Sequence, residues 1–205
     1  MAEAAVARQA AQPLPMVPRM TPPELDLFRT LLRATDTYLE FGTGGSTVEA
    51  AALVRRRVVS VDSSEAWLAK VAQACAAPVC RVKPELVFAD IGPVARWGRP
   101  ADDTHRHLWS GYHEAPWQGG GTSVSPDLCL IDGRFRVASF LQSLLRSRPD
   151  TLIAFHDFHR RNYHAVCEVA RIIARVDTLA VLVPRPGIDR AQTLGILAAY
   201  RENPD

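Results

Sequence analysis

Short, unbroken apolar runs alternate along the chain with longer segments in which apolar residues recur at helical spacing. An unbroken run is typical of a strand buried on both faces, and the recurring pattern is typical of an amphipathic helix. Strands are predicted at 37–41, 57–62, 86–90, 127–132, 151–156, 179–183 and 193–200. Helices are predicted at 22–33, 46–55, 64–75, 137–145 and 162–175.

The alternation of strands and helices predicts an α/β fold with a mostly parallel sheet and helices on both faces. The runs 179–183 and 193–200 have no predicted helix between them, so we expect them to form an antiparallel pair at one edge of the sheet. The first predicted helix begins with Thr21 and Glu24 at the spacing of a capping box, and two prolines occupy its first turn.

Two segments do not follow the alternation. Residues 1–20 contain three prolines after an Ala-rich start, which predicts an extended, flexible arm. Residues 91–126 hold three of the four tryptophans and the triple glycine 119–121, which is typical of a functional loop or lid, although a surface excursion with its own small apolar cluster is the alternative. The length of 205 residues predicts one domain, over 21–205, with 91–126 as an insertion.

Composition adds limits on compartment and partners. The chain is 47% apolar and 22% charged, which is typical of a globular protein and excludes disorder or a coiled coil as the main architecture. No run has the length of a membrane helix, and the N-terminus lacks the apolar core of a signal peptide. The four cysteines form no C-x-x-C pair, so we expect reduced thiols and a cytoplasmic location, with a homo-oligomer possible.

Polar residues gather where the predicted strands end. In an open parallel sheet, ligands bind beyond the carboxyl ends of the strands. Glycines at 42 and 44 after the first strand let the backbone approach a ligand closely. Asp62 ends the second strand, where a carboxylate can accept hydrogen bonds from both ribose hydroxyls. Asp90 ends the third strand, where it can receive an adenine amino group.

Two nucleotide cofactors compete for this site. The dinucleotide fingerprint G-x-G-x-x-G would need a third glycine where Thr47 stands. Glu40, two residues before the first glycine, is unfavourable beside the pyrophosphate of NAD but favourable beside an ammonium or sulfonium group. Because S-adenosylmethionine carries both groups, it is the predicted cofactor.

At this point the chain resembles the class I S-adenosylmethionine-dependent methyltransferases. The matching stretches are YLEFGTGGST (38–47), VVSVDSS (58–64), VFAD (87–90), PDLCLIDG (126–133) and LIAFHDF (152–158). The resemblance implies a Rossmann-like, seven-stranded sheet whose last strand is antiparallel. Gly45-Ser46 departs from the family's common G-x-G-x-G spacing. The predicted cofactor-binding residues are Glu40, Gly42, Thr43, Gly44, Asp62, Ser63, Asp90 and Asp132.

The candidate chemical site lies after the fourth and fifth strands. Asp132 and Asp157 end adjacent strands and look like the corresponding positions of O-methyltransferases that act on sugars, macrolides or catechols. Some of those enzymes use magnesium, which implies Asp132 and Asp157 as candidate ligands; a fold-stabilising carboxylate is the alternative for Asp132. The predicted catalytic residues are Asp132, which shares the site, and His156 or His159, as the base that deprotonates the acceptor.

Arginine supplies 22 of the 24 basic residues, which indicates either a compositional bias or a preference for acidic ligands. Two pairs directly follow the acidic strand ends, and they are predicted to bind an acidic or phosphorylated acceptor: Arg134, Arg136, Arg160 and Arg161.

The sequence therefore predicts a methyltransferase that transfers a methyl group from S-adenosylmethionine to a small molecule, at oxygen. Two alternatives stay open: a non-catalytic binding or assembly module with the same fold, and an NAD-type oxidoreductase. Nucleic acid is not the expected acceptor, because no extended basic stripe interleaves with aromatic residues.

Overall fold

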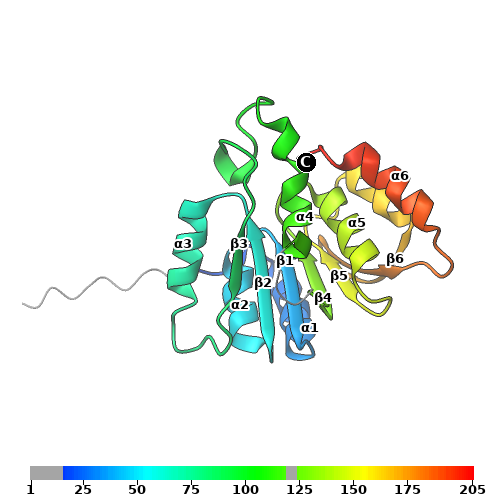
Figure 1. Cartoon of the computed structure of the whole chain (residues 1–205). Coiled ribbons are helices and arrows are strands. Elements are labelled where there is room, and N and C mark those ends of the chain that lie inside the picture. The colour runs from blue at the N-terminus through cyan, green and yellow to red at the C-terminus, as the bar shows by residue number, and fades with distance from the viewer. Residues whose placement is uncertain (1–15, 119–123) are drawn as a thin grey trace, which may run out of the picture.

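The computed structural model describes residues 16–118 and 124–205, without the side chain of Arg161. A seven-stranded sheet with the order β3-β2-β1-β4-β5-β7-β6 runs through the middle of the molecule (Figure 1). Its strands are β1 (Thr37–Phe41), β2 (Arg57–Asp62), β3 (Glu85–Phe88), β4 (Leu128–Ile131), β5 (Leu152–Phe155), β6 (Ala170–Val176) and β7 (Leu179–Pro184).

Six strands share one direction, and β7 alone runs opposite to them. The predicted mostly parallel sheet with an antiparallel last strand is confirmed. The strand order reverses between β1 and β4, where Phe41 pairs with Ile131. A crevice for ligands opens at such a reversal, beyond the carboxyl ends of the strands.

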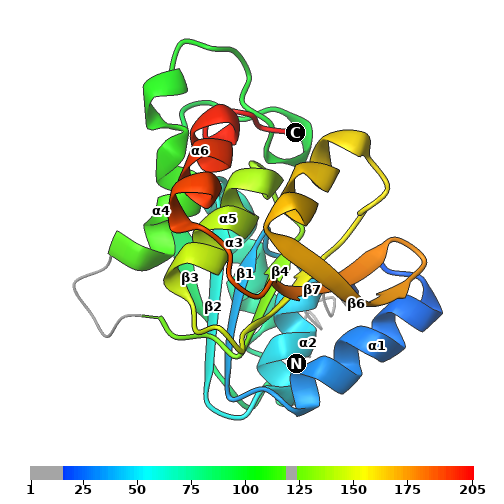
Figure 2. The same ribbon diagram turned by 90° about the vertical axis from the view of Figure 1, so that its right-hand side faces the viewer.

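Helices cover both faces of the sheet, as Figure 2 shows in side view. One layer contains α1 (Pro22–Arg33), α2 (Gly45–Leu53) and α3 (Glu65–Ala74), and the other contains α4 (Ser110–Gln118), α5 (Arg136–Arg146) and α6 (Arg190–Tyr200). Alternate strand residues enter two cores, because successive side chains of a strand point to opposite faces. Leu39 and Phe41 pack in the core beneath α5, whereas Tyr38 packs with Phe28 of α1.

The predictions for the chain after β5 were partly wrong. Residues 162–175 form a 3₁₀ helix, η3 (Arg161–Glu168), followed by β6 rather than one α-helix. Residues 193–200 belong to α6, not to a strand. The apolar run of α6 is half-exposed, with Thr193 and Leu197 buried, and the helix packs along α5. Periodicity alone does not separate a short apolar helix from a buried strand.

The insertion 91–126 is structured and joins the core. It contains η1 (Arg96–Gly98), η2 (Arg106–Leu108) and α4, and it buries Trp109 and Tyr112 against the sheet. The triple glycine lies outside the described residues. Of the arm 1–20, residues 16–20 are described: Met16 packs beside α2 and α3, and the backbone of Val17 and Pro18 fills the space beside Gly45.

The four cysteines are free thiols. Among the described residues, no helix is both long enough and apolar enough to cross a membrane.

Candidate active site at the carboxyl ends of the strands

The glycine loop after β1 packs directly on the loop after β4. Gly42 has φ +97°, and a Cβ atom there would lie 2.6 Å from the backbone of Gly133. Its N–H donates to the carbonyl of Val61 at 2.9 Å, which ties the turn to β2 as well. Only glycine satisfies both the backbone conformation and this approach. Gly44, by contrast, has an open side, where the nearest atom to an added Cβ would belong to Trp67 at 3.9 Å.

Glu40 lies beneath this loop and has no exposed surface. Its carboxylate accepts hydrogen bonds from Tyr38 at 2.9 Å and Ser60 at 2.7 Å, and from Thr47 of α2. Burial raises the pKa of Glu40 to about 7, although these hydroxyl donors oppose the shift. Glu40 therefore fixes the glycine loop and α2 to β1. Its direct contact with the cofactor stays a prediction.

Asp62 holds the same loop from the end of β2. One carboxylate oxygen accepts from the backbone N–H and the hydroxyl of Thr43, at 3.1 and 3.0 Å, and the other accepts from the Ser64 N–H at 3.1 Å. Burial raises the pKa of Asp62, while these donors lower it. Asp90 is exposed at the end of the neighbouring strand and accepts from the Gly92 N–H.

Residues from two distant segments meet above this region. Ser63 is buried, and its hydroxyl donates to the carbonyl of Gly98 in η1 at 3.5 Å. Trp97 directly precedes Gly98 and has φ +66°. The guanidinium of Arg19 lies 4.4 Å from the centre of the Trp97 ring. The insertion and the segment before α1 therefore cover the loops that follow β1 and β2.

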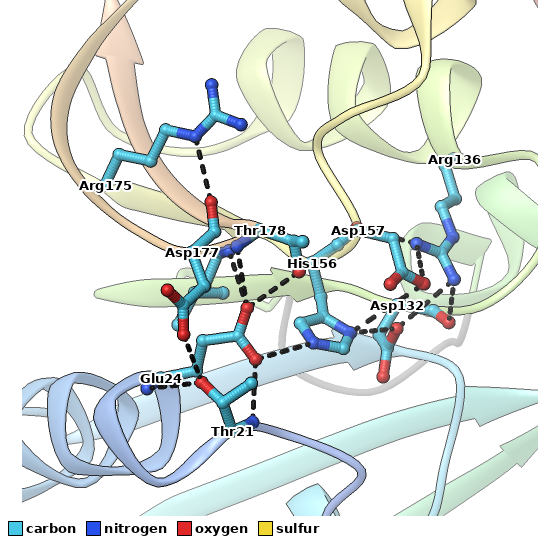
Figure 3. Close-up of polar contacts among 10 residues, drawn as sticks. Thr21, Glu24, Asp132, Arg136, His156, Asp157, Arg175, Asp177 and Thr178 are labelled. Atoms are coloured by element: carbon cyan, nitrogen blue, oxygen red, sulfur yellow. Dashed lines mark hydrogen bonds and ion pairs between the residues drawn. The ribbon is translucent and has the colours of Figure 1, made fainter.

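A second cluster lies at the ends of β4 and β5 (Figure 3). His156 donates through Nδ1 to Asp132 at 3.0 Å, and Arg136 reaches Asp132 at 3.3 Å and Asp157 at 3.2 Å. The guanidinium of Arg136 also donates to the backbone carbonyls of Gly133, His156 and Asp132. Arg136 is 5% exposed, so its charge is compensated by partners inside the protein.

Both carboxylates of this cluster retain an accessible side. The Asp132 and Asp157 side chains are 28% and 40% exposed. Oδ1 of Asp132 accepts from His156 and Arg136, whereas no described residue donates to its Oδ2. Asp157 has φ +58°, a left-handed conformation that a non-glycine residue adopts at a cost. The arrangement can therefore offer an oriented carboxylate oxygen to a ligand.

The solved structures most informative about this chain are methyltransferases. A methyltransferase-like protein from Silicibacter pomeroyi is 30% identical, with a TM-score of 0.83 over 92% of this chain and 98% of that one. The chain belongs to the class I S-adenosylmethionine-dependent methyltransferases. No protein-family model matches it, and no curated protein matches it.

More distant structures share the fold of this methyltransferase. An O-methyltransferase from Bacillus cereus in complex with S-adenosylhomocysteine is 16% identical, with a TM-score of 0.55 over 82% of this chain and 84% of that one. An RNA methyltransferase from Salinibacter ruber is 17% identical, with a TM-score of 0.51 over 85% and 97%. Neighbours with different acceptors share this architecture, so the acceptor has to be argued from the site itself.

The residues present in this methyltransferase fit the cofactor. The open side of Gly44 leaves room above the glycine loop, and Asp62 and Asp90 place carboxylates at the ends of adjacent strands. A carboxylate is the acceptor that ribose hydroxyls and an adenine amino group need. Three other predicted cofactor residues, Thr43, Ser63 and Asp132, make the internal contacts given above, so their contact with a cofactor stays a prediction.

Glu24 is a further member of the cluster at the ends of β4 and β5. The sequence indicated only its role in capping the first helix. Its Oε2 lies 3.4 Å from Nε2 of His156, while its Oε1 accepts from the N–H and the hydroxyl of Thr178 at 2.8 and 2.7 Å. Burial raises the pKa of Glu24, but the hydrogen bonds from Thr178 and Thr21 and the charge of His156 bring it down to about 2. No local pattern reveals a contact that spans 132 positions of sequence.

The prediction of His156 as a general base stays a prediction, and the surroundings of the ring favour its charged form. Burial lowers its pKa, but the hydrogen bond to Asp132 and the charges of Asp132, Asp157 and Glu24 raise it to about 9. Both ring nitrogens face carboxylates, so the imidazole is a buried cation at neutral pH. His159 is exposed, and its backbone N–H donates to the carbonyl of Asp157 at 2.7 Å.

Asp132, His156 and Asp157 each offer a ligand atom within 4.8 Å of the others. A metal at this position would compete with two cations that the methyltransferase already supplies, the Arg136 guanidinium and the charged His156 ring. The repulsion between the two carboxylates is relieved by these side chains, so the reason for expecting magnesium here is removed.

The four predicted acceptor-binding arginines differ in availability. The guanidinium of Arg136 contacts carbonyls and carboxylates of the described residues, so its role in binding an acceptor stays a prediction. Arg160 is exposed and lies 5.9 Å from the ring centre of Tyr163, and the Arg161 side chain lies outside the described residues. Arg134 has a buried Nε without a hydrogen-bond partner among the described residues. Arg134 and Arg160 are therefore the more available candidates.

Proposed function

We propose that this methyltransferase transfers the methyl group of S-adenosylmethionine to a hydroxyl oxygen of a small molecule, without a metal ion. The observation that carries the proposal is the state of Asp132: one carboxylate oxygen is held by His156 and Arg136, and the other is free to accept a hydrogen bond. A hydroxyl group that donates to this oxygen would be fixed at the switch point of the sheet.

The cofactor would be held by Asp62, Asp90 and the backbone of the glycine loop. The open side of Gly44 and the position of Asp62 beside this loop support this assignment. When bound, S-adenosylmethionine supplies a methyl group already activated on a sulfonium. The protein therefore needs only to position the acceptor and remove its proton.

The two tasks fall to different residues in this proposal. Arg136 and His156 hold one oxygen of the Asp132 carboxylate in a fixed position, which makes Asp132 the proposed orienting acceptor. His159 is exposed and follows β5, at the same end of the sheet as Asp132, so it is the proposed proton acceptor. Arg136 and His156 keep Asp132 in place and balance its charge.

Two features support a small acceptor. The Asp132 carboxylate is only 28% exposed, so a reactive group must enter between the loops to reach it. The insertion and the segment before α1 cover the neighbouring strand ends, as shown by the contact of Arg19 with Trp97.

Calorimetry with S-adenosylhomocysteine tests the cofactor, and release of S-adenosylhomocysteine from a panel of hydroxy compounds tests the acceptor. We expect activity to persist with a chelator and to fall about 100-fold in Asp132→Asn. The control is Asp26→Asn, which changes an exposed carboxylate on α1. Activity confined to amine acceptors, or abolished by the chelator, would contradict the proposal. A chain that binds no cofactor would instead favour the non-catalytic alternative.

A further inference from the structure

Arg134 is a largely buried cation with too few partners. Its side chain is 19% exposed, and its nearest carboxylate is that of Asp205, at 4.0 Å. Its Nε is buried with no acceptor among the described residues, and the like charge of Arg136 lies nearby. Burial and this neighbour lower the pKa of Arg134. A buried charge without a full set of partners is costly unless an anion completes it.

Asp205 reaches Arg134 from the far end of the chain. In both views, the C-terminal residues lie beside the insertion (Figures 1 and 2). The Asp205 carboxylate forms an ion pair with Arg99 of the insertion, and the carbonyl of Pro204 accepts from the Phe135 N–H at 3.4 Å. The Asp205 and Arg99 side chains are 40% and 52% exposed, so the pair can open to solvent.

The space around Arg134 adjoins both parts of the active site. Its Cγ lies 4.0 Å from the position of a Cβ on Gly98, whose carbonyl accepts from Ser63, the residue after β2. Its backbone N–H donates to Tyr112 of α4 at 3.4 Å, and Asp132 is two residues earlier in the chain. Arg134 therefore lies between η1, whose Gly98 contacts Ser63, and the loop after β4 that begins at Asp132.

We propose that Arg134 and Arg99 bind a carboxylate or phosphate group of the acceptor, and that Asp205 occupies this position until the acceptor displaces it. The proposal rests on the proposed function and narrows its acceptor to hydroxy compounds that carry an acidic group. Arg134 supplies the partly desolvated charge that distinguishes an anion from a neutral analogue. Arg99 and Asp205 form a solvent-exposed pair, which an incoming anion can separate at small cost.

Calorimetric titrations with simple probes test the site without knowledge of the acceptor. The anionic probes are inorganic phosphate and benzoate, and the neutral analogue is benzamide. We expect Asp205→Asn to bind both anions about fivefold more tightly than the unaltered chain, because the internal competitor has lost its charge. Adding Arg134→Gln should weaken that binding about tenfold. Arg148→Gln, whose guanidinium pairs with Asp127 and Asp150, should change nothing.

The same variants separate the acceptor from the other source of a carboxylate, which is the amino-acid part of the cofactor. We expect the affinity for S-adenosylhomocysteine to stay within about twofold in Arg134→Gln. If this affinity falls as far as that for benzoate, the arginine binds the cofactor and the proposal is overturned. Equal binding of phosphate and benzoate by Asp205→Asn and the unaltered chain would also overturn it. Failure of the proposed function is distinct, because the unaltered chain would then bind no S-adenosylhomocysteine.

Discussion

Nε2 of His156, at the end of β5, lies 3.4 Å from a carboxylate oxygen of Glu24, in the first turn of α1. The same glutamate caps its own helix through Thr21 and binds the backbone before β7 through Thr178. One carboxylate thus connects the start of α1, the β6–β7 turn and the catalytic end of the sheet. Its replacement is expected to affect stability as well as activity.

Glu24→Gln should lower the free energy of unfolding by about 2 kcal/mol, because the substitution leaves the charged His156 ring with one fewer anionic partner. Urea unfolding measures the loss. The matched control is Glu49→Gln, which removes a partly exposed ion pair with Arg29 and should cost less than about 1 kcal/mol. Equal losses in the two variants would show that the Glu24 contact contributes no more than a surface pair.

His156 should make stability depend on pH in the alkaline range. Its pKa is about 9 in the folded protein and 6.5 in a model peptide, so the folded state binds the proton more tightly. The protonated ring therefore stabilises the folded state by up to about 3 kcal/mol. This stabilisation is complete below pH 6.5 and is lost as the pH rises through 9. The measurement is the difference in unfolding free energy between the unaltered chain and His156→Gln. Glu40 is present in the unaltered chain and in the variant, so its titration cancels from the difference in unfolding free energy. A difference that stays constant from pH 6 to 10 would contradict a charged His156.

Gly42→Ala should be more damaging than another glycine substitution at positive φ. The new Cβ would lie 2.6 Å from the Gly133 backbone, and a backbone shift there moves the loops after β1 and β4 together. Gly187→Ala is the matched control, because Gly187 has φ +69° but no atom within 4 Å of an added Cβ. We expect about 1 kcal/mol of lost stability for Gly187→Ala and about 3 kcal/mol or more for Gly42→Ala. Similar melting temperatures in the two variants would refute the close approach.

Asp62→Asn should weaken the binding of S-adenosylhomocysteine about tenfold. The substitution removes the charged acceptor of the Thr43 and Ser64 hydrogen bonds, and with it the proposed ribose contact. Calorimetry gives the affinity directly. Asp36→Asn is the control, because Asp36 pairs with Arg55 on the surface. An unchanged affinity in Asp62→Asn would reject the ribose role.

The sheet and its first five strands could be predicted from the sequence because each strand is a local apolar run with a local terminator. After β5, the strand predicted at 179–183 corresponds to β7, whereas η3, β6 and α6 could not be predicted. Residues 170–176 combine exposed Arg171 and Ile173 in an edge strand, a mixture that also suits an amphipathic helix. Tertiary pairing with β7 decided the outcome.

In the candidate site, too, local features could be predicted from the sequence and tertiary contacts could not. Asp62, Asp90 and Asp132 stand at strand ends and could be found from strand boundaries alone. The charge state of His156 could not, because it depends on Glu24, Asp132 and Asp157 together. Arg134 and Arg136 are two positions apart in sequence. The Arg136 guanidinium is engaged by carbonyls inside the protein, whereas Nε of Arg134 has no acceptor among the described residues. This difference depends on the packing of α5 and of the C-terminal residues.

The contact between Glu24 and Thr178 also sets an order of assembly. Glu24 is synthesised long before Thr178 and Leu179, yet its Oε1 accepts from both of them, at the start of β7. The β6–β7 turn therefore has its acceptor on a distant segment of the chain, and such contacts form more slowly than local ones. A nascent or truncated chain that stops before Thr178 would present the glycine loop after β1 without the contact that ties α1 to β7, so methyl-transfer competence should arise only after β7 has been made.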